Sequence, residues 1–138
     1  SRCLNFRIFL NEEEKKDVCK KLFKEDITNL INNDLINYYY SPGEIFQLLK
    51  FSYDKEINLK TTNLKDFLLL IINKSFYKES IIVKNLVYNM FEFFLIKNVS
   101  LIYSDLYRYF LKKINETKKF NLDEESLFLE IKTKLLNE

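Results

Sequence analysis

The amino-acid sequence predicts an all-α fold, and three observations lead to this prediction. The 138 residues include a single Gly and a single Pro, although β-sandwiches and barrels need many such residues in their tight turns. Hydrophobic residues make up 47% of the chain and aromatic residues 16%, which excludes a disordered segment because disorder requires few of both. Apolar residues also recur at helical spacing along most of the sequence.

The beginning of the chain predicts an extended entry followed by helices. Residues 1–9 are expected to be extended, because Leu4, Phe6 and Ile8 alternate with polar residues. Asn11 then precedes three glutamates and can cap a helix, with Glu14 at the third helical position as in a capping box. A second helix is expected to begin at Asp26 and to place its apolar residues, as far as Tyr38, on one face.

The single Pro and the single Gly of the chain stand together in Ser41-Pro42-Gly43. Ser is a common helix cap and Pro suits the first helical position, so a third helix is expected to start at this turn. Residues 52–62 are polar and aperiodic, and domain boundaries fall in such segments. They therefore predict a division between a part over residues 1–52 and a part over residues 60–138.

Four longer helices are expected in the second part. They cover residues 63–74, residues 79–97, a segment from Ser100 or Ser104 to about Asn115, and a last segment capped by Asn121 or Asp123. Each carries apolar residues at helical spacing, so the four predict a helical bundle around a common core.

The composition excludes several kinds of catalytic and metal site. The chain has no His, which excludes Ser-His-Asp and Cys-His catalysis and imidazole metal ligands. One Gly is too few for a phosphate-binding loop, and two cysteines are too few for the usual structural zinc site. We therefore expect no cofactor, no metal and no enzyme activity in this chain by itself.

Charge and hydropathy bear on the partners and the location of the chain. The formal net charge is +2 and is evenly spread, whereas nucleic-acid modules are far more basic, so direct binding to DNA is not expected. The longest apolar runs, 67–72 and 90–96, fall well short of the roughly 20 residues of a membrane span. Two thiols without a recognisable leader predict a reducing, cytoplasmic setting.

The motif Ser1-Arg2-Cys3 opens a characteristic order of features. It is followed by the extended stretch, the acidic helix start and then the turn Ser41-Pro42-Gly43. This order resembles the clamp-loader subunits of the AAA+ class, in which a Ser-Arg-Cys motif closes the nucleotide-binding domain and a three-helix lid follows. Members of the family often have Arg and Ala after the turn, whereas this chain has Glu44 and Ile45.

The second half of the chain extends the resemblance. Asn121-Leu122-Asp123 opens the last predicted helix, and this is similar to the start of the final collar helix in delta-prime subunits of bacterial DNA polymerase III. Another clamp-loader subunit is the alternative within the family. The resemblance implies a three-helix lid over residues 1–52, a helical collar for oligomerisation over residues 60–138, and a chain that is the C-terminal piece of such a subunit.

The resemblance also implies a function and partners. The collar would hold together the subunits of the complex that uses ATP to load the sliding clamp onto primed DNA during replication. The parent holoenzyme is a DNA-directed DNA polymerase, a nucleotidyltransferase. The partners would be the other loader subunits, and ATP would be met only in a neighbouring subunit. Arg2 would act in trans as an arginine finger, because its planar fork of donors fits phosphate oxygens.

Aromatic residues are more numerous than one face of each helix can bury. In the run over residues 88–96, Phe91 and Phe94 are three positions apart, while Phe93 points elsewhere. Apolar residues around more than one face indicate a helix that is covered on more than one side. We therefore expect these three residues to be candidates for a subunit interface, with at least one accessible in the lone chain. The alternative is that they belong to a large aromatic core.

A second function stays open at this point. The alternative to the clamp-loader hypothesis is an independent all-helical adaptor for protein–protein contacts that has no link to replication. The two hypotheses differ in what precedes Ser1, because only the first requires an AAA+ core upstream of it.

Overall fold

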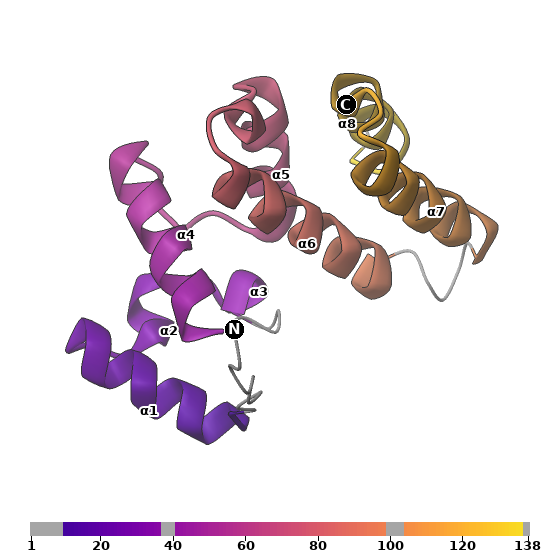
Figure 1. Cartoon of the computed structure of the whole chain (residues 1–138). Coiled ribbons are helices and arrows are strands. Elements are labelled where there is room, and N and C mark those ends of the chain that lie inside the picture. Colours follow the sequence, from indigo (N-terminus) through magenta and orange to yellow (C-terminus); the bar gives the residue numbers. More distant parts are fainter. Residues whose placement is uncertain (1–9, 37–40, 99–103, 137–138) are drawn as a thin grey trace, which may run out of the picture.

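The structure is a computed structural model that describes residues 10–36, 41–98 and 104–136. Within these ranges it contains eight α-helices, one 3₁₀ turn and no β-strand (Figure 1). The elements are α1 (Glu12–Phe23), α2 (Ile27–Leu30), α3 (Asn33–Ile36), α4 (Pro42–Asp54), α5 (Leu64–Asn73), η1 (Phe76–Lys78), α6 (Ile81–Asn98), α7 (Ser104–Phe120) and α8 (Glu124–Lys134). The prediction of an all-α fold is confirmed. The extended entry with Ser1-Arg2-Cys3, Tyr38 and Ser100 lie outside the described residues.

The helix starts of α1 and α4 follow the predicted caps. The Glu14 amide donates to Asn11 Oδ1 at 2.9 Å, and the Asn11 amide donates to Glu14 Oε2 at 2.8 Å, which completes a capping box. Ser41 caps α4 with Pro42 in its first turn. Both predictions are confirmed. The caps form because the first turn of any helix leaves amide groups without partners inside the helix.

The single second helix expected from Asp26 is wrong. Asp26 does cap a helix, but α2 ends after four residues and α3 begins at Asn33. Between them Ile31 is extended, and the Asn32 amide donates to the carbonyl of Leu59 at 2.9 Å. The Asn32 amide is therefore bonded to a distant segment instead of continuing the helix. The described residues of the first part thus form four helices, whereas three were expected.

The segment over residues 52–62 packs against both parts of the chain. Helix α4 continues to Asp54, and Leu59 is buried with an exposed fraction of 3%. From the first part, Asp34 accepts a hydrogen bond from the Leu64 amide at 3.1 Å and pairs with Lys97 on α6. The division into parts over residues 1–52 and 60–138 stays a prediction, but side chains of the two parts are in direct contact.

The second part is arranged around α6, which packs against α4, α5, η1 and α7 (Figure 1). Asn63 caps α5, and Asp123, one of the two predicted candidates, caps α8. The 3₁₀ turn η1 was not predicted, and it places the buried Tyr77 against the ring of Phe128 on α8, with 4.4 Å between ring centroids. Helix α6 is therefore covered on several sides by its own chain.

The buried residues form one continuous hydrophobic core. Leu35 on α3 and Leu48 on α4 are fully buried, as are Phe67 on α5 and Phe128 on α8. Within the described ranges, no helix has both the length and the apolar character needed to cross a membrane.

Candidate functional site

A polar groove crosses the first half of α6, and its lining comes from four helices and one turn. Glu44 enters from the start of α4, Tyr88 and Asn89 from α6, and Asn121 and Glu124 from the α7–α8 junction. The cavity volume is about 590 Å³. Asn121, from the motif Asn121-Leu122-Asp123, therefore lines the same groove as Glu44, the residue that directly follows the motif Ser41-Pro42-Gly43.

The turn Ser41-Pro42-Gly43 positions Glu44, which lines the groove. The Ser41 amide donates to Glu44 Oε2 at 2.8 Å, and the Glu44 amide donates to Ser41 Oγ at 3.2 Å, so this turn is also a capping box. The second carboxylate oxygen of Glu44 accepts from Asn89 Nδ2 at 3.5 Å. Glu44 is one of the departures from the family pattern, and its position links α4 to α6.

The turn between α7 and α8 also contributes to the groove through Asn121. Asn121 has a φ of 52°, a left-handed conformation that Asn tolerates better than most residues and that ends α7. Asp123 accepts hydrogen bonds from the amides of Glu125 at 3.1 Å and Ser126 at 3.3 Å. Its bonds with Ser126, first of all that with the hydroxyl, lower the pKa of Asp123, because they favour the ionised carboxylate. The prediction left the cap open between Asn121 and Asp123, and the structure shows that it is Asp123.

Side chains that line the groove join α6 to α8. The Tyr88 hydroxyl donates to Glu124 Oε1 at 3.1 Å, and Lys84 Nζ lies 3.0 Å from the same oxygen. Lys118 Nζ pairs with Glu92 at 2.6 Å and lies 5.1 Å from the centroid of the Tyr88 ring. Burial, together with the charge of Glu124, raises the pKa of Tyr88, so the hydroxyl stays protonated at neutral pH and serves as a donor.

The chemistry of this groove fits recognition of another protein segment. Carboxylates and ammonium groups pair with one another, while the amide side chains of Asn85 and Asn121 are exposed and offer both donors and acceptors. Ile81, with an exposed fraction of 70%, adds an apolar contact at the same groove. In the described part of the chain, no group of three or more His, Cys, Asp or Glu side chains could hold a metal ion.

Of the three interface candidates Phe91, Phe93 and Phe94, only Phe93 is partly accessible in the lone chain, and a role in a subunit interface stays a prediction. Phe91 is fully buried and stacks on Phe128 with 5.4 Å between ring centroids, and Phe94 is 8% exposed. Phe93 is half-buried, with Lys97 Nζ 6.0 Å from its ring centroid. The reason is that α6 is covered on several sides, as the sequence indicated, but by helices of this same chain.

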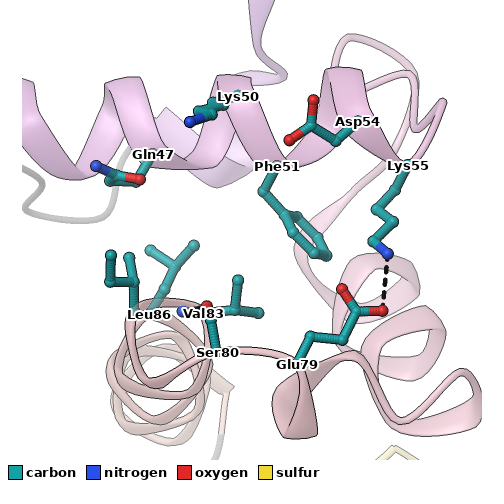
Figure 2. A pocket seen from close by; sticks show the side chains of 10 residues that line it. Gln47, Lys50, Phe51, Asp54, Lys55, Glu79, Ser80, Val83 and Leu86 are labelled. Carbon is teal, nitrogen blue, oxygen red and sulfur yellow. Dashed lines mark hydrogen bonds and ion pairs between the residues drawn. The ribbon is translucent and has the colours of Figure 1, made fainter.

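A second hollow lies between α4 and the η1–α6 corner, and it has a cavity volume of about 330 Å³ (Figure 2). Figure 2 shows the Phe51 ring pointing from α4 toward this corner and Lys55 reaching Glu79. The Lys55 Nζ to Glu79 Oε1 distance is 2.7 Å. The Phe51 ring also meets the ring of Phe76 with 5.6 Å between centroids. This hollow therefore marks the packing of α4 on the second part.

Sequence reasoning missed most of the residues that line the polar groove. Glu44 carried a local signal, because Ser41 and Glu44 are spaced as in a capping box. Tyr88, Asn89 and Glu124 carried none, since their proximity depends on how α4, α6 and α8 pack. Arg2, the candidate arginine finger, lies outside the described residues. Comparison of the chain with family models, with curated proteins and with solved structures finds no match.

Proposed function

We propose that this chain is a non-catalytic assembly part of a clamp-loader subunit, with delta-prime as the specific member of the family. Its second part would hold a neighbouring subunit in the complex that loads the sliding clamp onto primed DNA. The proposal rests on the sequence resemblance, on the all-α fold, and on the presence of Glu44 and Asn121 at one groove.

The single observation that carries the proposal is that Asn121 of one motif and Glu44, which follows the other motif, line one groove. Ser41 and Asn121 are far apart in the sequence, yet Glu44, bonded to Ser41, and Asn121 itself line the same polar cavity across α6. Capping of α4 and α8 explains each turn separately, but it does not require the two turns to contribute to one groove. A groove between them with exposed amide groups gives a neighbouring subunit a hydrogen-bonding site that is defined by both turns.

The groove predicts the result of a steric block. Replacing Asn85 by Arg would place a long charged side chain in the cavity from an exposed position on α6, so folding should be unaffected. We expect association with the other loader subunits to weaken by about tenfold or more, which corresponds to about 1.4 kcal/mol. Sedimentation of the reconstituted complex measures this. The matched control is Asn115→Arg on α7, an exposed Asn that does not line the groove.

Normal assembly of the Asn85→Arg complex, with the control also normal, would show that the groove is not a subunit contact. The adaptor hypothesis would then be favoured, in which the chain binds proteins outside replication.

The role of Arg2 is tested separately in a loader built on the full-length subunit. An arginine finger contributes about 10³–10⁵ to phosphoryl transfer in other NTPases, so we expect Arg2→Ala to slow ATP hydrolysis at the neighbouring site at least about tenfold. Assembly should be unchanged, because the proposed partner of Arg2 is a nucleotide. Arg2→Lys should restore activity only in part, since an ammonium group lacks the bidentate fork.

The control for this experiment is Arg108→Ala, which removes an exposed Arg on α7. Unchanged ATP hydrolysis in the Arg2→Ala loader would refute the finger. It would leave the assembly function to be judged by the groove variants.

A further inference from the structure

An apolar groove lies on the first part of the chain, away from the polar groove. It is formed by the end of α1, by α2, by the outer face of α4 and by the turn that follows α4. Phe23, Leu30, Phe46, Leu49, Tyr53 and Ile57 supply its apolar lining, and its cavity volume is about 510 Å³.

The α4 side of this groove is a stripe of three large side chains, of which Phe46 and Tyr53 are exposed and Leu49 is half-buried. Phe46, Leu49 and Tyr53 follow one another at three- and four-residue spacing, which places them on one face of the helix. Phe46 is 50% exposed and Tyr53 is 85% exposed. The Phe46 ring is stacked on the Phe23 ring with 6.4 Å between centroids and 14° between planes, so α1 continues the apolar surface. Contiguous apolar surface of this kind marks sites of association.

The charge in the groove specifies the chemistry of a partner. Among the described residues that line it, Lys50 is the single charged one, and no acidic side chain lines it. Lys50 lines both this groove and the α4–α6 hollow (Figure 2). Asp54 and Lys55 line the α4–α6 hollow and not this groove, and Lys55 pairs there with Glu79. Lys50 is exposed and one helical turn before Tyr53. A carboxylate on a partner would complement it.

A second copy of this chain fits the groove poorly. In a twofold contact the same patch meets itself, and Lys50 stands between Phe46 and Tyr53 near the middle of the stripe. Two such stripes would bring their ammonium groups close together, and like charges that face each other weaken an interface. The occupant is therefore expected to be a different, acidic segment.

We propose that this groove binds an amphipathic α-helix of another protein, with apolar residues at positions i, i+3 or i+4, and i+7 and with a carboxylate that faces Lys50. The stripe from Phe46 to Tyr53 covers two helical turns, and a groove between helices accepts the apolar ridge of a third helix. This inference does not depend on the function proposed above, since it concerns another face and another partner.

The test uses the whole chain as bait for a displayed library of peptides of about 16 residues, or about four helical turns. The most enriched peptide is then synthesised, and its affinity is measured by fluorescence anisotropy. We expect enriched peptides to combine the apolar spacing with Asp or Glu. Tyr53→Ser should weaken binding about tenfold or more, as loss of an aromatic anchor does. Lys50→Glu should weaken it by a similar factor, and a peptide with Lys in place of its carboxylate should restore binding to that variant.

The matched control is Phe120→Ser, which removes a 60% exposed aromatic residue from α7 and should leave affinity unchanged. Circular dichroism checks that each variant is folded. The proposal is overturned if no peptide is enriched, or if the best peptide binds the Lys50→Glu and Tyr53→Ser variants as tightly as the original chain. It is also overturned if sedimentation shows a dimer of the chain that Tyr53→Ser dissociates, because a second copy then occupies the groove.

Discussion

Replacing Phe128 by Ala should lower the free energy of unfolding by about 3–5 kcal/mol, the usual cost of removing a buried Phe side chain. Phe128 is fully buried on α8, where three aromatic rings surround it. Its ring centroid lies 4.4 Å from that of Tyr77 on η1, and 5.4 Å from those of Tyr88 and Phe91 on α6. The cavity left by the ring would remove packing contacts of α8 with both η1 and α6. The Tyr88 ring would lose the contact with Phe128 that helps to position its hydroxyl toward Glu124.

Urea denaturation followed by circular dichroism measures this loss. The matched control is Leu129→Ala on the same helix, because Leu129 is 61% exposed and its replacement should cost less than about 0.5 kcal/mol. A Phe128→Ala protein as stable as the control would show that α8 does not depend on this aromatic contact.

A second large effect is expected at Phe51, because it joins the two parts of the chain. Phe51 is 7% exposed on α4, and its ring contacts those of Phe67 on α5 and Phe76 on η1, with centroid distances of 6.4 Å and 5.6 Å. Replacement by Ala should cost about 3 kcal/mol, at the lower end for a buried Phe since the ring borders an open hollow (Figure 2). The loss should appear in both parts, because one core runs through them.

Hydrogen exchange resolved by segment distinguishes coupled from independent parts. In the Phe51→Ala protein, amides in α4 and in α8 should both exchange faster and by similar factors if the two parts unfold together. Tyr53→Ala is the control, since Tyr53 is on the same helix and 85% exposed. Faster exchange in α4 with unchanged α8 would show instead that residues 1–52 and 60–138 are independent units, as the polar segment between them suggests.

Local signals in the sequence were sufficient to locate most of the helices. Asn11, Ser41, Asn63 and Asp123 each accept hydrogen bonds from amides two or three residues ahead, so each helix start is decided within one turn of chain. The scarcity of Gly and Pro, with apolar residues at helical spacing, likewise determined the all-α class from local features of the sequence. These features depend on near neighbours and not on the rest of the fold.

Tertiary structure alone decided the break at Asn32, the burial of Phe91 and Phe94, and the groove between Glu44 and Glu124. The Asn32 amide donates its hydrogen bond to the Leu59 carbonyl and not to a carbonyl within a helix, and no local sequence pattern identifies this partner. The sequence showed that α6 would be covered on several sides, but whether its own chain or another covers it depends on how α4, α5 and α7 pack. Because the hydrophobic effect is non-directional, the apolar residues of a helix face predict that the face is buried but not which surface covers it.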